Sequence, residues 1–160
     1  MKAIVIGTSL SGKTTIIRQL RLVTKIPVSE MDEELTRLNG GNFPTDSNYK
    51  HNVLVPQVIE SVLNKDKIIF FTNTDYFTFD DLQKAKQSGF KIIQLVLDRE
   101  LLNKRNEQRI RNEGYEDLSK WFDGMLKYQK LLEKKGLVDN VIQAGQPSAE
   151  TANEILNTIS

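Results

Sequence analysis

The sequence has no cysteine, no apolar stretch long enough to cross a bilayer, and no excess of either charge. Without cysteine there are neither disulfides nor zinc–thiolate sites, which is typical of a reducing cytosol. A membrane-spanning helix needs about 20 apolar residues, so we expect no membrane partner. The 22 Lys and Arg residues against 21 Asp and Glu give a formal net charge of +1. This balance removes any global electrostatic argument for nucleic-acid binding.

What is present describes an ordinary globular protein. The 160 residues are 39% hydrophobic and 27% charged, which is typical of one folded domain with a proper core. The first expected strand begins at Lys2, so we expect no signal peptide and a cytoplasmic location.

Residues Gly7–Thr14 form the most informative segment. They read Gly-Thr-Ser-Leu-Ser-Gly-Lys-Thr, a complete GxxxxGK[ST] phosphate-binding loop, directly after the apolar run Lys2–Ile6. The four fixed positions coincide by chance in about one chain of this length in a few hundred. A strand before the loop and a helix after it lower that chance further. We therefore expect the segment to bind a nucleoside triphosphate. The expected contacts are Gly7, Thr8, Ser9, Leu10, Ser11, Gly12, Lys13, Thr14 and Thr15.

The residue types in this loop suit phosphate binding. Consecutive backbone N–H groups and the following helix N-terminus form a concave positive site. Gly7 and Gly12 permit backbone angles and close approach that a side chain blocks. Lys13 is expected to reach the outer phosphates, and the Thr14 hydroxyl is expected to ligate Mg²⁺.

Apolar runs alternate with amphipathic stretches along the chain, without repeats or linkers. Strands are expected at 2–6, 26–31, 67–72, 91–97 and 138–143. Helices are expected after the loop and at 50–63, 78–89, 100–112, 116–135 and from 148 onwards. This order predicts a single α/β domain, residues 1–160, with three layers (α/β/α) and a central five-stranded parallel sheet. Right-handed crossovers then place ligands at the carboxyl ends of the strands.

Local signals set several helix boundaries. Thr78 and Asp81 have the spacing of a capping box, and Ser148 is predicted to cap the last helix. Pro56 is expected to kink or split the helix at 50–63. A stripe at helical spacing is predicted to belong to the core. Its members are Trp121, Met125, Tyr128 and Leu132.

Three features give the sequence a resemblance to the P-loop small-molecule and nucleotide kinases, which include adenylate-type, shikimate-type and nucleoside kinases. They are the phosphate-binding loop, the acidic cluster Glu30-Met31-Asp32 at the end of the second expected strand, and Leu102-x-x-Arg105-x-x-x-Arg109 after the fourth. The resemblance covers the whole chain. It implies a P-loop kinase fold, ATP or GTP with Mg²⁺, an acceptor-binding region at about 30–64 and a helical lid at about 105–130.

Arg105 and Arg109 carry like charges one helical turn apart, which is mildly destabilising, on the same side as Leu102. A bound anion would offset this repulsion, and guanidinium groups bind phosphate through their planar fork. Glu113 is an alternative partner for Arg109. The resemblance implies that Arg105 lies over the base or phosphates and that Arg109 contacts the transferring phosphoryl group. It also implies that the loop Ala144, Gly145, Gln146 and Pro147 meets the base.

Asp32 is the predicted acceptor-orienting carboxylate, with Glu30 second. By resemblance such an acid accepts the acceptor proton or holds the Mg²⁺ shell, so Asp32 and Thr14 are the predicted metal ligands. Phosphoryl transfer needs an acceptor oxygen in line more than a strong base. The alternative is that residues 30–34 are an acidic helix N-terminus, stabilised by the helix dipole. Arg37 is predicted to hold an acceptor anion, or else to pair with a neighbouring acid on the surface.

Two further positions are less defined. The third expected strand ends in Thr72 and Asn73, where many P-loop proteins carry a metal-organising acid, and Asp75 comes later. This departure leaves the metal site beyond Thr14 open. His51 is the only histidine, and a surface position is favoured over a catalytic one.

The sequence therefore predicts an ATP-dependent phosphotransferase acting on a small metabolite, nucleoside or nucleotide. The predicted catalytic residues are Lys13, Asp32, Arg105 and Arg109. Two alternatives stay open: an ATP-binding regulatory module without an acceptor, and a kinase for nucleic-acid ends, against which the near-neutral charge argues. No pattern identifies the acceptor.

Overall fold

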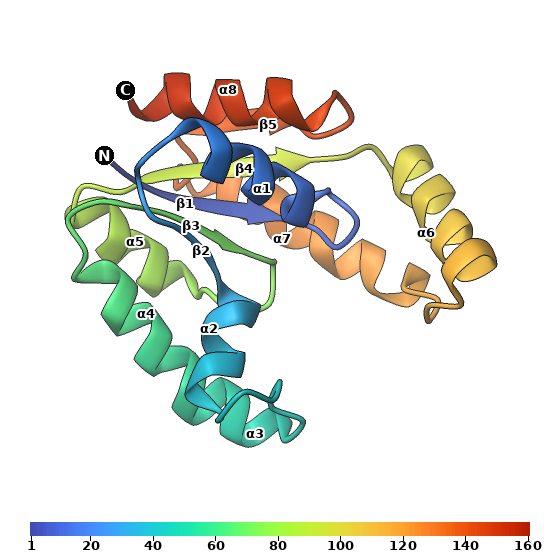
Figure 1. The fold of residues 1–160 in the computed structure, drawn as a ribbon, viewed down its shortest axis with the longest axis horizontal. Coiled ribbons are helices and arrows are strands. Elements are labelled where there is room, and N and C mark those ends of the chain that lie inside the picture. The colour runs from blue at the N-terminus through green and yellow to red at the C-terminus, as the bar shows by residue number, and fades with distance from the viewer.

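Five parallel strands form the centre of the computed structural model, which describes all 160 residues (Figure 1). β1 lies between β3 and β4, with Ile6 opposite Thr72 and Gly7 opposite Leu95. The five-stranded parallel sheet predicted from the sequence is confirmed. In spatial order the strands are β2 (Val28–Glu30), β3 (Ile68–Thr72), β1 (Lys2–Gly7), β4 (Lys91–Val96) and β5 (Asn140–Gln143).

The central strands are apolar on both faces because helices cover both sides of the sheet. Ala3 and Val5 of β1 pack into the core on one face, while Ile4 and Ile6 pack into the core on the other. All four side chains are fully buried. The continuous apolar run before the phosphate-binding loop therefore fixes β1 in the middle of the sheet.

The helices form the outer layers (Figure 1). α1 (Lys13–Val23) and α8 (Ser148–Ile159) cover one face. α4 (Val55–Leu63), α5 (Phe79–Gln87) and the C-terminal part of α7 (Phe122–Lys134) cover the other, while Phe122 and Met125 at the start of α7 pack into the first core. None of the helices combines the length and apolarity that a bilayer span requires.

Two helical segments stand apart from these layers, beyond the carboxyl ends of the strands (Figure 1). α2 (Met31–Leu38) begins where β2 ends, and α3 (Ser47–Tyr49) follows it. α6 (Arg99–Glu113) follows β4 and projects on the opposite side. The space between these segments is where the parallel sheet places a ligand.

Several predicted boundaries are confirmed. Thr78 Oγ1 accepts from the Asp81 N–H at 3.1 Å, and Asp81 Oδ2 accepts from the Thr78 N–H at 3.0 Å, which completes the capping box. Pro56 does interrupt the predicted helix. The helical stretch begins earlier, at α3, and passes through a π-helical segment, η1 (Lys50–Leu54), so that Pro56 falls in the first turn of α4.

The predicted helix at 116–135 begins too early. Only a short 3₁₀ turn, η2 (Ser119–Trp121), precedes α7. The buried Asn106 side chain causes this, because its amide accepts from the Leu118 N–H at 3.0 Å and donates to Asp117 at 2.8 Å. Trp121 is 57% exposed, so its assignment to the core was wrong, whereas Met125 is buried.

The predicted cap of the last helix was also wrong. Ser148 is the first residue of α8, and Pro147 occupies the capping position without a side-chain hydrogen bond.

Candidate active site

The segment Thr8–Gly12 turns the chain sharply from β1 into α1. Leu10 has φ 68° and Gly12 has φ 83°, both in the left-handed region. Gly7 is required for a different reason, since a Cβ there would lie 2.6 Å from Ser11 Oγ. The glycine pattern seen in the sequence therefore corresponds to one position of special backbone geometry and one of close approach.

The N-terminus of α1 presents free donors at this turn. The N–H groups of Gly12, Lys13, Thr14 and Thr15 donate no hydrogen bond within the protein. Gly12, Thr14 and Thr15 are solvent-exposed. Unpaired N–H groups at the positive end of a helix dipole attract an anion, and several in a row suit a phosphate chain.

Two buried hydroxyls in the loop also lack partners. Thr8 Oγ1 and Ser11 Oγ make no hydrogen bond, although Thr8 is 0% and Ser11 1% exposed. A buried hydroxyl without a partner is costly. Ser11 lines the cleft above the loop, so a bound polar ligand there would remove this cost.

The Lys13 side chain folds back over the start of the phosphate-binding loop. Its ammonium group donates to the Gly7 carbonyl at 3.1 Å and to the Thr8 carbonyl at 2.8 Å. Burial lowers the pKa of Lys13 to about 8, against the opposing attraction of Glu30 and Asp32. A polyphosphate bound beside Lys13 would raise this pKa, because negative charge favours the charged ammonium form.

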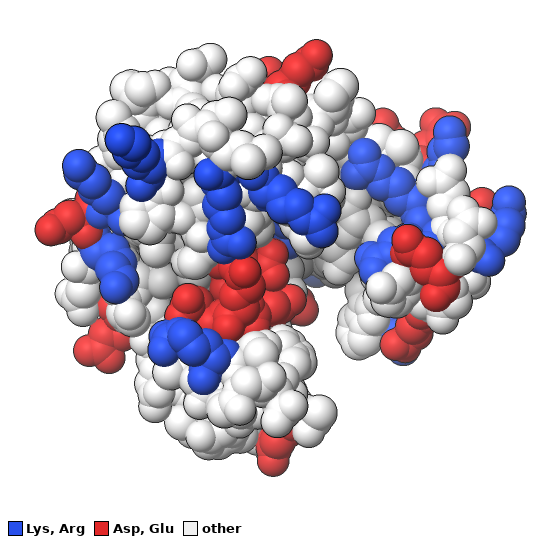
Figure 2. Space-filling view, in the orientation of Figure 1, with Lys and Arg blue, Asp and Glu red and all other residues white.

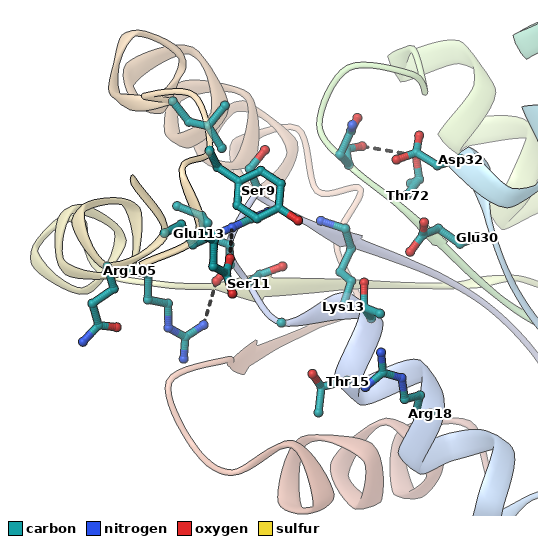
Figure 3. A pocket seen from close by; sticks show the side chains of 18 of the residues that line it. Ser9, Ser11, Lys13, Thr15, Arg18, Glu30, Asp32, Thr72, Arg105 and Glu113 are labelled. Carbon is teal, nitrogen blue, oxygen red and sulfur yellow. Dashed lines mark hydrogen bonds and ion pairs between the residues drawn. The ribbon is translucent and has the colours of Figure 1, made fainter. Parts of the chain in front are cut away.

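A cleft of about 820 Å³ opens above the loop (Figure 3). Its walls come from the loop and α1, from the ends of β2 and β3, and from the far half of α6 with the residues after it. Figure 2 shows acidic side chains gathered over the start of α2, beside the hollow that separates it from α6, with basic side chains nearby. The basic residues that line the cleft are Lys13, Arg18, Arg105 and Arg109.

Glu30 and Asp32 face Lys13 from the opposite wall (Figure 3). Glu30 ends β2, and Asp32 lies in the first turn of α2. Desolvation raises the pKa of Glu30, and the neighbouring Asp32 raises it further. Desolvation also raises the pKa of Asp32, although Lys13 and Lys50 oppose the shift. Nearby cations therefore offset only part of the cost of placing these two negative charges in the cleft.

The two arginines of α6 reach the cleft in different ways. Arg105 donates through Nη1 to the Leu10 carbonyl at 2.7 Å and through Nη2 to the Ala144 carbonyl at 3.5 Å. Arg109 lies 4.2 Å from the centre of the Tyr115 ring, and its Nε is 3.6 Å from a Glu113 oxygen. Arg105 is thus joined to the phosphate-binding loop, while Arg109 is held by its own neighbours.

Other predicted site residues lie elsewhere. Arg37 lines a separate cavity between α2 and α4 and pairs with Glu34 at 2.7 Å. The segment 144–147 does not line the cleft and is joined to it through Arg105. Base contacts by this segment and anion binding by Arg37 remain predictions.

The structure brings further residues close to Asp32, of which Tyr76 and Lys50 were not singled out in the sequence. Asn73 lines the cleft, and its Oδ1 accepts from the Asp75 N–H at 2.8 Å. Tyr76 is buried, with Lys50 Nζ 5.5 Å and the His51 ring 5.5 Å from its ring centre. His51 is half-buried rather than on the open surface. The turn-forming Asn-Thr-Asp after an apolar strand was the available signal.

No group of three or more acidic, His or Cys side chains is placed to hold a metal ion. Mg²⁺ is commonly held by one or two protein oxygens together with substrate phosphates and water. The exposed Thr14 hydroxyl at the start of α1 fits this arrangement.

No family model matches the sequence, and no curated protein is detectably similar to it. Solved structures do match over nearly the whole chain. Shikimate kinase from Aquifex aeolicus vf5 is 20% identical, with a TM-score of 0.76 over 99% of this chain and 96% of that one. A gluconokinase from Sinorhizobium meliloti 1021 is 18% identical, with a TM-score of 0.62 over 99% and 91%.

A third similar structure is the YorR protein from Bacillus subtilis, in complex with phosphorylated GDP. It is 18% identical, with a TM-score of 0.66 over 99% of this chain and 95% of that one. Identities this low establish the fold and leave the acceptor open. The chain has the three-layer α/β/α fold of the P-loop kinases.

Proposed function

We propose that the protein is an ATP-dependent phosphotransferase that moves the γ-phosphoryl group to a hydroxyl of a small molecule. One observation carries the proposal. A row of free N–H groups with Lys13 faces the carboxylates Glu30 and Asp32 across a single cleft. Shikimate kinase and gluconokinase, which share the fold, are kinases of small hydroxy compounds by name.

The nucleotide side of the cleft consists of residues 7–15 with Arg105. The free N–H groups and Lys13 would bind the β and γ phosphates, and Arg105 would stabilise charge close to the loop. Thr14 would hold Mg²⁺, which when bound neutralises charge on the phosphates.

The acceptor side consists of Glu30, Asp32, Thr72 and Asn73. Asp32 would hold the acceptor hydroxyl in line and accept its proton as the new P–O bond forms. Arg109, on the far half of α6, would approach the transferring group as α6 closes over the cleft. The excluded water would otherwise compete as the acceptor.

The direct test is ADP formation from Mg·ATP across a panel of sugars, polyols, hydroxy acids, nucleosides and nucleotides. Lys13→Ala should lose at least about 10²-fold in turnover, the size expected for one preorganised charge-stabilising donor. Lys67→Ala is the matched control, because Lys67 is exposed and lies outside the cleft. Acceptor-dependent ADP formation that Lys13→Ala retains would exclude this role of the loop.

A further inference from the structure

The cations that line the cleft are confined to one of its sides, which also carries Glu113. All four lining cations lie on α1 or α6, whereas the acceptor side contributes Glu30 and Asp32 and no lining cation. Figure 3 shows both carboxylates on the wall opposite Arg105. Ser11, 1% exposed and without a hydrogen-bond partner, independently indicates that the cleft takes a polar ligand.

An anionic acceptor would need a cation on the acceptor side of the cleft, and neither of the two nearby cations, Arg37 and Lys50, lines the cleft. Arg37, the guanidinium that follows Asp32 on α2, pairs with Glu34 and lines a different cavity. Lys50 acts on Asp32, but it does not line the cleft, and its ammonium group is 5.3 Å from the centre of the Phe43 ring and 5.5 Å from that of Tyr76.

On the other side Arg18 lies on α1 and makes no ion pair within the protein, whereas Arg105 and Arg109 already have partners. Arg105 donates to two backbone carbonyls, and Arg109 is paired with Glu113. Under the proposed function, Lys13 and the N–H groups of α1 are occupied by the nucleotide phosphates. A carboxylate or phosphate ester next to Glu30 and Asp32 would therefore be repelled by two negative charges, with no guanidinium group on that side to bind it.

We propose that the phosphoryl acceptor is a polyhydroxy compound without negative charge, such as a sugar, polyol, nucleoside or amino sugar. Carboxylates accept hydrogen bonds from neutral hydroxyls and attract ammonium groups, so Glu30 and Asp32 suit both. The inference rests on the proposed function and narrows its acceptor. It excludes acceptors that a kinase would recognise through a carboxylate or phosphate group.

The test compares matched acceptors that differ mainly in charge: D-glucitol against D-gluconate, methyl shikimate against shikimate, and nucleosides against their 5′-monophosphates. With Mg·ATP present, kcat/KM should be at least tenfold higher for the member without negative charge. Glu30→Gln should reduce that ratio severalfold. Glu33→Gln is the control, since Glu33 is the same residue type nearby but pairs with Arg21 at 2.9 Å outside the cleft.

Equal or better use of the anionic members would overturn the inference and leave the phosphotransferase proposal standing. A ratio that Glu30→Gln and Glu33→Gln change equally would also overturn it, because the preference would then not arise from the cleft. No ADP formation with any acceptor, from protein that binds Mg·ATP, would overturn the proposed function and this inference together.

Discussion

The proposed nucleotide side of the cleft is lined largely by one continuous segment, residues 9–15, whereas the proposed acceptor side combines the ends of two strands and the start of α2. The first uses mainly backbone N–H groups, whose positions follow from the turn itself. The second uses side chains that are brought together by tertiary packing. A backbone site tolerates sequence change around it, while a side-chain site can be altered one residue at a time.

This contrast matches the similar structures. A shikimate kinase and a gluconokinase share the fold at 20% and 18% identity, although their names indicate different acceptors. Differences in acceptor are expected in the segments that β2 and β3 lead into.

The largest effect is expected from a substitution on the acceptor side that lowers turnover and leaves ATP affinity nearly unchanged. Asp32→Asn keeps the side-chain shape but removes the proton acceptor and its charge, so turnover should fall about 10²-fold. ATP affinity should change less than about twofold, because Asp32 lies across the cleft from the loop. Turnover and calorimetric ATP affinity are measured on the same protein. Full turnover with the best acceptor would remove Asp32 from the reaction.

A smaller effect is expected from pH on the nucleotide side alone. The pKa of Lys13 is about 8 without ligand, and bound phosphates favour the charged ammonium form, so its pKa rises on binding. Affinity for Mg·ATP should be greatest below pH 8 and fall by up to about tenfold per pH unit as pH rises from 8 towards the higher bound pKa. Titrations between pH 7 and 10 measure this.

The matching variant is Lys13→Ala, whose residual affinity should not change over the same pH range. A flat wild-type profile, or an equal slope in the variant, would assign the pH dependence to another group.

The smallest effects concern the backbone of the loop. Gly12 has φ 83°, so Gly12→Ala should lower the free energy of unfolding by about 1 kcal/mol. Gly124 lies inside α7 with open space where a Cβ would stand. Gly124→Ala should therefore raise the free energy of unfolding by about 0.5–1 kcal/mol. Urea unfolding of the two variants gives both values, and a Gly12→Ala protein as stable as wild type would exclude backbone strain at the loop.

Sequence reasoning succeeded where the determining residues are adjacent. The apolar run before Gly7 and the fixed positions through Thr14 defined β1, the loop and α1 together. The Thr78–Asp81 capping box is equally local. Such features depend on spacing along one segment, which a single sequence displays in full.

It failed where the determining contact is distant. Trp121 fitted a core stripe by spacing, but Asn106, on the preceding helix, holds residues 117–119 in a turn and leaves the indole exposed. For Arg37 the sequence left an anion and a neighbouring acid open as partners, and only the direction of α2 shows that it pairs with Glu34 and lines another cavity. Tyr76 and Lys50 approach Asp32 only through tertiary packing.

The central claim is that free N–H groups at the start of α1, together with Lys13, bind a polyphosphate. Isothermal titration of the folded protein with Mg·ATP at pH 7 tests it most directly. We expect saturable binding that Lys13→Ala weakens strongly and Lys67→Ala leaves unchanged. No binding of Mg·ATP or Mg·GTP to correctly folded protein would contradict the account.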